Sequence, residues 1–191
     1  MRLSLFKNYK AWSDEQLAES VCRSADEGAF EELYHRYARL LQGFFFRRMG
    51  GDEEQAADLM QDTFMKIWSA RADYKEGQSF RTWIFTIAYN LCKNIYRSNQ
   101  HEEEYLSTLP EEEPAEEDDT PVKLDAETLD KALKKEVALL SEQQQMLFEL
   151  RFTQELSVRE IAEIIGIAEG TVKSRLHTMI QQLRIKLKDY E

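Results

Sequence analysis

An acidic, proline-containing run near the middle of the chain limits what the chain can fold into. Residues 102–119 carry ten Asp and Glu side chains and no Lys or Arg, and the chain's three prolines are Pro110, Pro114 and Pro121. Like charges repel one another and proline interrupts helices, so this segment predicts an extended, solvated linker. We therefore expect two small domains, over residues 1–98 and 123–191, joined by an acidic flexible linker over residues 99–122.

The position of these acidic residues changes what the net charge implies. The formal net charge is −11, which by itself argues against a polyanionic partner such as DNA. Ten of those negative charges lie in the predicted linker, so the rest of the chain has a balance of only −1. Either domain can therefore bind nucleic acid. The linker itself is either a spacer that merely repels itself or a regulatory mimic of DNA.

Glycine and proline are too scarce for a sheet-rich fold, which favours an all-α chain. The chain has 7 Gly and 3 Pro, whereas sheets need many tight turns. No stretch approaches the 18 apolar residues that span a bilayer, so we expect a cytoplasmic protein without membrane insertion. Cys22 and Cys92 lie far apart and only three histidines are present, so the sequence predicts no metal site. No catalytic nucleophile or phosphate-binding loop is recognisable either, so we expect neither a cofactor nor an enzyme.

Four helices are expected in the first half, and three of them begin after a typical helix cap. These caps are Ser13, which forms a capping box with Gln16, Asp52 and Ser79, and the second helix is expected to start near Asp26. Gly50 and Gly51 should end the second helix. The segment 74–78 is expected to be a loop. The fourth helix should bury one apolar stripe, formed by Phe80, Trp83, Ile84, Ile87, Leu91 and Ile95.

The second half carries the pattern of a helix-turn-helix. Capping boxes at Ser141 and Ser157 open two helices, Gly166 ends the second of them, and a three-residue turn leads to a helix starting near Glu169. The buried stripe of that last helix is predicted to contain Val172, Leu176, Ile180, Leu183 and Leu187. Its first two turns should then expose Lys173, Ser174, Arg175, His177 and Thr178. These side-chain types suit major-groove contacts, although a solvated face of an amphipathic helix is the simpler alternative.

Two other helices have faces that fit binding. The fourth helix mixes aromatic residues with Arg81, Lys93 and Arg97, which is typical either of a hydrophobic core or of a platform for unstacked bases. The third helix is expected to expose Asp58, Gln61, Asp62, Met65 and Lys66. That face is either a solvated acidic surface or a protein-docking surface.

Three motifs in order resemble the sigma-70 family, and the match extends over nearly the whole chain. DLMQDTFMKIW is similar to the family's DLxQExFLxxW motif, and FRTWIFTIAYNL is similar to FRxWLxxIARNL. The segment from LSEQQQMLFEL to TMIQQLR resembles the family's C-terminal domain. The short two-domain length resembles the extracytoplasmic-function group. The resemblance implies a sigma-2-like helical bundle and a sigma-4-like helix-turn-helix domain.

The resemblance also implies partners and a role for each surface. A sigma factor binds core RNA polymerase, through the β′ clamp and the β flap, and starts transcription at promoter DNA; an anti-sigma factor is a further expected partner. Docking on the clamp is carried over to Asp58, Leu59, Gln61, Asp62, Phe64 and Trp68. Reading and melting of the −10 element are carried over to Tyr74, Ser79, Arg81, Trp83, Asn90, Asn94 and Arg97. Reading of the −35 element is carried over to Glu169, Thr171, Lys173, Ser174, Arg175 and His177.

Two departures from the family pattern affect these expectations. Asn94 stands where many relatives carry Asp, which leaves the −10 base preference open. Ala168 replaces the usual Ser or Pro at the start of the last helix, so that helix should lack a side-chain cap. The alternative function is a sigma-like decoy or adaptor that binds an anti-sigma factor without reading DNA. A decoy should lose its DNA-reading residues, whereas Arg81, Arg97, Lys173 and Arg175 are present here.

Overall fold

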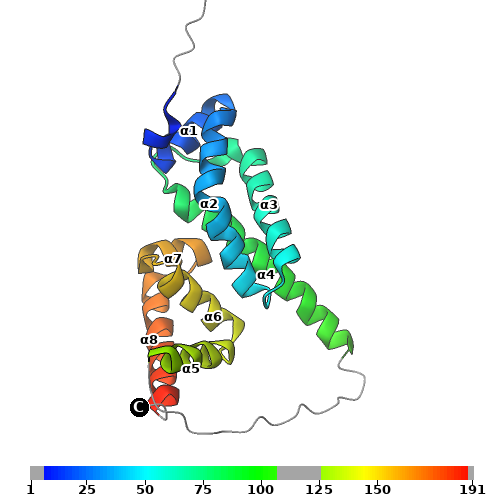
Figure 1. Ribbon diagram of the computed structural model, residues 1–191, viewed down its shortest axis with the longest axis vertical. Coiled ribbons are helices and arrows are strands. Elements are labelled where there is room, and N and C mark those ends of the chain that lie inside the picture. Colours follow the sequence, from blue (N-terminus) through cyan, green and yellow to red (C-terminus); the bar gives the residue numbers. More distant parts are fainter. Residues whose placement is uncertain (1–6, 107–125, 189–191) are drawn as a thin grey trace, which may run out of the picture. The chain divides into compact units, whose positions relative to one another are not determined.

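Every regular element that the structure describes is helical. The computed structural model describes residues 7–106 and 126–188, and no strand occurs within these ranges (Figure 1). The all-α prediction is therefore confirmed. The chain divides into two compact units, Met1–Arg97 and Ser98–Glu191. Most of the predicted acidic linker, and with it the linker's expected role, lies outside the described residues.

The first unit is a bundle of four α-helices. They are α1 (Asp14–Ser24), α2 (Glu27–Arg48), α3 (Glu53–Ser69) and α4 (Phe80–Leu106), with short 3₁₀ segments η1 (Tyr9–Ala11) and η2 (Arg71–Asp73). The helix starts follow from local capping. The side chains of Ser13, Asp26, Asp52 and Ser79 each accept a hydrogen bond from a backbone N–H three residues later. The predicted caps Ser13, Asp52 and Ser79 are confirmed, and the second helix starts next to Asp26, as expected. In contrast, α4 continues to Leu106, into the segment expected to be extended.

The buried face of α4 differs from the predicted stripe. Phe80 and Ile84 are buried as expected, and the other fully buried apolar residues of α4 are Phe85, Ala88 and Cys92. Trp83, Ile87, Leu91 and Ile95 are only half-buried. The reason is that Phe85 packs edge-on against Phe44 of α2, with ring centroids 5.5 Å apart, which turns this side of α4 inward. The predicted stripe contained only large apolar side chains, whereas the small side chains of Ala88 and Cys92 also face the core.

Asp26 joins the N-terminal segment to α1 and α2. Its carboxylate accepts hydrogen bonds from Lys7 Nζ (2.6 Å), Tyr9 Oη (2.7 Å), Ser20 Oγ (2.8 Å) and the Ala29 backbone N–H (3.2 Å). Burial alone would raise the pKa of Asp26, but these four donors hold that pKa well below its ordinary value. The charged carboxylate is therefore the form that the folded state stabilises.

We expect Asp26→Asn to destabilise the protein at neutral pH and much less in acid. Asn is also a good helix cap, so the change mainly removes the negative charge, and a loss of about 1 kcal/mol is the usual size for one hydrogen-bonded group. The folded pKa is depressed, so its stabilisation is complete above the unfolded pKa of about 3.9 and is lost as the pH falls toward the folded value. Urea unfolding of both proteins from pH 7 to pH 3 measures this. A difference that stays constant over this range would contradict the assignment.

The second unit contains α5 (Ala126–Ala138), α6 (Glu142–Phe148), the π-helical segment η3 (Glu149–Thr153), α7 (Val158–Ile165) and α8 (Glu169–Leu187). Capping boxes at Ser141 and Ser157 are both present, as predicted. Leu147, Leu150, Leu156 and Ile161 form the centre of the core. The unit therefore has its own hydrophobic interior.

The predicted stripe of α8 is only partly correct. Val172, Leu176 and Leu183 are buried, but Met179 is buried as well, while Ile180 and Leu187 are half-buried. In α5 the small side chain of Ala132 is buried, while Leu129 is exposed. Met and Ala side chains therefore face the core beside the large aliphatic ones.

Candidate functional site

The helix-turn-helix of the second unit is formed by α7, a short turn and α8. α7 ends at Gly166, whose φ of 77° lies in the left-handed region that favours glycine. α8 then begins at Glu169, and Ala168 before it makes no side-chain capping bond, as predicted. Val172, Leu176 and Met179 are buried beneath the helix. Spacings of four and three residues fix the rotation of α8 about its axis, and with it the side chains that face outward.

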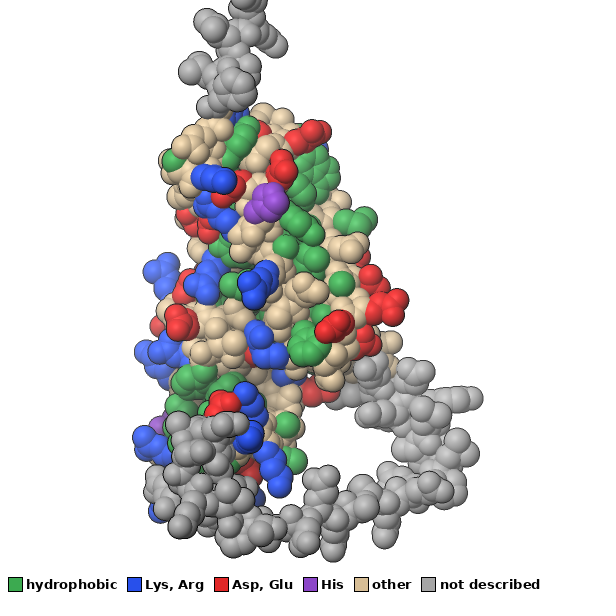
Figure 2. All heavy atoms as spheres, in the orientation of Figure 1, with side chains coloured by type: hydrophobic (Ala, Val, Ile, Leu, Met, Phe, Trp, Pro, Cys, Tyr) green, Lys and Arg blue, Asp and Glu red, His purple; other side chains and the backbone are tan. Residues whose placement is uncertain are grey.

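The outward face of α8 carries the residues expected to read the −35 element. Glu169, Lys173, Ser174, Arg175 and His177 are all exposed, and Thr171 is half-buried. The Ser174 hydroxyl donates to the Thr171 carbonyl at 3.0 Å, which leaves its oxygen free to accept. Lys and Arg side chains project along α7 and α8 in Figure 2. The structure therefore brings this predicted set together on the solvent-accessible sides of the first turns of α8.

The predicted −10 residues on α4 lie at different depths. Asn90, Asn94 and Arg97 are exposed, while Arg81 and Trp83 are half-buried. Ser79 caps α4, since its Oγ accepts from the Thr82 N–H at 3.2 Å. The exposed face of α4 can thus offer amide and guanidinium groups to a nucleic acid, and Ser79 acts by starting the helix.

Tyr74 does not lie where a base could stack on it. Its side chain is only 6% exposed, and its ring centroid lies 5.2 Å from that of Trp83. Its hydroxyl donates to the Gln78 carbonyl. Burial, with the Glu15 and Glu19 carboxylates nearby, raises the pKa of Tyr74 above its ordinary value and keeps this donor protonated. In this structure Tyr74 supports the loop from inside, and its role at the −10 element stays a prediction.

The docking set on α3 divides into an exposed and a buried group. Asp58, Gln61 and Asp62 are exposed, as the helical pattern predicted. Leu59 and Phe64 are buried, so their contribution is to hold α3 in the bundle. A motif match does not distinguish these two groups, whereas burial does.

An apolar groove lies beside the exposed α3 residues, and α2 forms part of its lining. Its volume is about 540 Å³, and residues lining it include Phe30, Tyr34, Gln61, Phe64, Met65 and Trp68. Phe30 packs against Trp68 at 5.0 Å and Tyr34 against Phe64 at 4.8 Å between ring centroids. Met65 is 67% exposed, and hydrophobic side chains gather over α2 and α3 in Figure 2. The groove was not predicted from the sequence, because its lining comes from two helices that lie side by side.

Two classes of site are not found in the described residues. No group of His, Cys, Asp and Glu there is arranged to hold a metal ion. Among the helices described, none is long and apolar enough to cross a bilayer.

Two family matches decide which family the chain belongs to. Residues 33–102 match sigma-70 region 2, and residues 130–183 match sigma-70 region 4. The RNA polymerase sigma factor YlaC of Bacillus subtilis is 34% identical over 84% of this chain and 90% of its own length. The chain belongs to the extracytoplasmic-function group of sigma-70 factors. This sigma factor is also 33% identical to the RpoE protein of Cereibacter sphaeroides, over 88% of the chain and 91% of that relative.

Two solved structures have the same fold. RpoE of Bartonella quintana, solved in complex with the anti-sigma factor NepR, matches with a TM-score of 0.63 at 27% identity, over 83% of this chain and 96% of that one. CnrH, solved with the cytosolic domain of CnrY, gives a TM-score of 0.67 at 23% identity, over 93% and 99%. The family expectation from the three sequence motifs is therefore confirmed, and the protein is a transcription initiation factor.

Proposed function

We propose that this sigma factor docks on core RNA polymerase through α3 and reads promoter DNA with α4 and α8. The observation that carries this assignment is the display on α8. Four side chains able to contact DNA, Lys173, Ser174, Arg175 and His177, stand on a helix whose opposite side is locked into the core. Such a helix can enter a major groove without rearrangement of its own unit.

The −35 element is assigned to α8 because its groups match base edges and phosphates. Arg175 can bond O6 and N7 of one guanine with two parallel hydrogen bonds. Lys173 supplies a point charge for a phosphate, and the α8 N-terminus adds the attraction of its backbone N–H groups. Ala168 offers no side-chain acceptor at this helix end, so a phosphate oxygen can take the place of a cap.

The −10 element is assigned to the exposed part of α4 and the loop before it. Asn90, Asn94 and Arg97 provide amide and guanidinium donors along one side of the helix. Trp83 is half-buried against Tyr74, so it offers part of its ring while the rest is fixed. Base stacking on such a ring contributes about 1–3 kcal/mol for each base.

Protein partners are assigned to the α3 surface and to the second unit. Asp58, Gln61 and Asp62 border the groove that Met65 and Trp68 line, which combines an apolar centre with a polar rim, as protein interfaces do. We assign this surface to the β′ clamp and the second unit to the β flap. An anti-sigma factor is a further partner, as NepR is for the sigma factor RpoE of Bartonella quintana. These roles place the protein in the cytoplasm, without enzymatic activity.

Run-off transcription with purified core RNA polymerase tests the proposal. We expect the protein alone to bind promoter DNA weakly, because two small basic surfaces make few phosphate contacts at physiological salt. Adding core polymerase should produce transcripts from defined start sites. Tight promoter binding by the free protein, unchanged by polymerase, would contradict the proposal. A decoy would bind an anti-sigma factor and produce no specific transcript with any genomic fragment.

A further inference from the structure

The loop between η2 and α4 is held by α1 at its beginning, middle and end. The Cys22 Sγ lies 3.9 Å from the Tyr74 carbonyl oxygen, which is a weak S–H hydrogen bond. The Arg23 Nη2 lies 3.0 Å from the Glu76 Oε2. The Phe80 backbone N–H donates to the Glu15 carboxylate at 3.4 Å. One helix, far from this loop in the sequence, therefore contacts it along its whole length.

The tip of this loop is a tight turn that forms by itself but needs an external contact to fix its direction. The Gln78 N–H donates to the Lys75 carbonyl at 3.0 Å, and Gly77 has a φ of 78°. Glycine at this third position is typical of a type II turn. Glu76 occupies the second position, at the outer corner. These bonds set the shape of the turn, whereas the contact between Arg23 and Glu76 joins its corner to the bundle.

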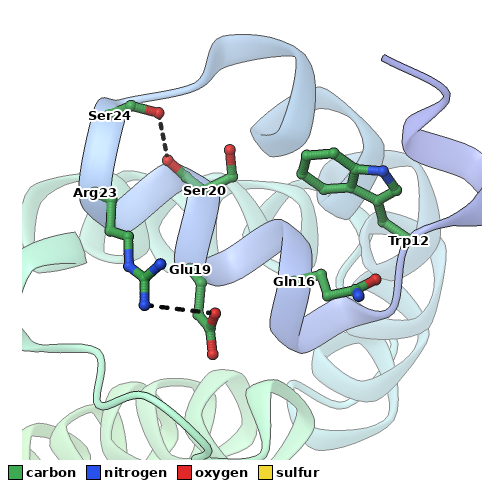
Figure 3. Close-up of a pocket in the computed structure, with 6 residues that line it drawn as sticks. All are labelled: Trp12, Gln16, Glu19, Ser20, Arg23 and Ser24. Carbon is green, nitrogen blue, oxygen red and sulfur yellow. Dashed lines mark hydrogen bonds and ion pairs between the residues drawn. The ribbon is translucent and has the colours of Figure 1, made fainter.

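Arg23 stands between two carboxylates and lies closer to the one on the loop. Its Nη2 is 3.9 Å from the Glu19 Oε2 on its own helix, compared with 3.0 Å for Glu76. Figure 3 shows Arg23 and Glu19 on one side of α1, where they line a shallow pocket with Trp12 and Gln16. Because the guanidinium of Arg23 lies closer to Glu76 than to Glu19, we expect a substitution of Arg23 to affect the loop more than α1.

This ion pair contributes little to overall stability. The side chains of Arg23 and Glu76 are 63% and 75% exposed, and exposed ion pairs are weak because water and salt screen them. A weak contact can still choose between loop orientations, since orientations of an exposed turn differ little in free energy. The effect of this pair should therefore appear in the function of the loop and leave the melting temperature unchanged.

We propose that Arg23 is a positioning residue that orients the turn at residues 75–78 for opening of the −10 element. The inference rests on the proposed function of the loop and α4, and it adds α1 to the elements that act in strand opening. Arg23 acts through Glu76 and need not contact DNA. The pair also neutralises the Glu76 carboxylate, which would otherwise repel a nearby phosphate.

A charge swap in the polymerase holoenzyme tests the inference. The proteins compared are wild type, Arg23→Glu, Glu76→Arg and the double variant, and the measurement is the rate of promoter opening, followed by 2-aminopurine fluorescence within the −10 element. We expect Arg23→Glu to slow opening about two- to fivefold, in keeping with one exposed ion pair. Adding Glu76→Arg should then restore the rate to within about twofold of wild type. The decisive quantity is the coupling between the two substitutions in a double-mutant cycle. It shows whether the opening rate depends on the contact between Arg23 and Glu76 or only on the charge of each residue.

Three controls distinguish a misdirected loop from a general defect of the protein. Glu19→Gln removes the competing carboxylate on α1 and should not slow opening. Melting temperatures and affinities for core polymerase should be the same for all variants, which excludes a general structural defect. Opening by Arg23→Glu at the wild-type rate, or an equal effect of Glu76→Arg in both backgrounds, would overturn the inference. If the wild-type holoenzyme opens no promoter, the proposed function fails first and the inference fails with it.

Discussion

Replacing Gln61 and Asp62 together with Ala should weaken binding of core RNA polymerase by about ten- to a hundredfold. Both side chains are exposed on α3 beside the apolar groove, so their loss removes polar contacts at the edge of the proposed interface. A few residues usually supply most of the binding free energy of an interface, and about 1.4–2.8 kcal/mol corresponds to this range. Helix content and melting temperature should not change, because neither residue contributes to the core. Titration of labelled protein with core polymerase measures the affinity.

The same helix supplies a matched control for this prediction. Glu53→Ala with Gln55→Ala also removes one carboxylate and one amide from exposed positions of α3, and it changes the net charge equally. Glu53 lies on the opposite side of α3 from Asp62, and Gln55 lies on the same side as Asp62 but seven residues earlier, about 10.5 Å along the helix. The control should bind core polymerase nearly as well as wild type. Equal weakening by both pairs would show that only the charge of α3 matters, and no weakening by either would remove α3 from the interface.

The features that sequence predicted well are set by neighbouring residues. Ser13 with Gln16 and Ser157 with Glu160 form capping boxes because each pair is three residues apart, whatever surrounds the helix. The same locality explains the left-handed glycine at Gly166. Helix starts, the turn of the helix-turn-helix and the exposed face of α8 could therefore be predicted from the chain alone.

The features that sequence could not predict depend on what packs against a helix. Phe85 and Cys92 face inward because α2 presents Phe44 to that side of α4, and no spacing within α4 contains this information. Tyr74 was assigned to DNA contact from its place in a motif, yet Phe80 and Trp83 enclose its ring. Motif positions thus combine residues that touch a partner with residues that hold the surface in place.

The groove between α2 and α3 shows the same limit at a binding surface. Tyr34 lies beside the buried Leu33 and Tyr37 in the helical spacing of α2, but it is 38% exposed because α3 covers only part of that face. Its ring packs on Phe64, so it forms one wall of the groove next to Met65. The sequence contained one usable signal, since an exposed Met on an otherwise polar helix face is common at interaction surfaces. The second wall required the structure.

Arg175→Ala should abolish discrimination at one base pair of the −35 element while leaving the rest of recognition intact. Arg175 is exposed on the second turn of α8, and the buried Val172 and Leu176 on either side of it fix the direction in which it points. A bidentate contact to guanine contributes about 1–3 kcal/mol of discrimination, which is about five- to 150-fold in relative promoter strength. Loss of a phosphate contact, which we expect for Lys173→Ala, should weaken all promoters alike.

Transcription from promoters with every single substitution in the −35 element distinguishes these two behaviours. Arg184→Ala is the matched control: it removes the same side chain from an exposed position of α8, nine residues further on and about 13.5 Å along the helix. Nine residues correspond to two and a half helical turns, so Arg184 points to the opposite side of α8 from Arg175. This control should therefore keep the wild-type ranking of promoter strengths. Arg175→Ala should give equal activity for all four bases at one position, and that position identifies the base pair it contacts. If Arg175→Ala keeps the wild-type ratios at every position, Arg175 does not read a base, and specificity must come from other residues on α8 or from the shape of the DNA.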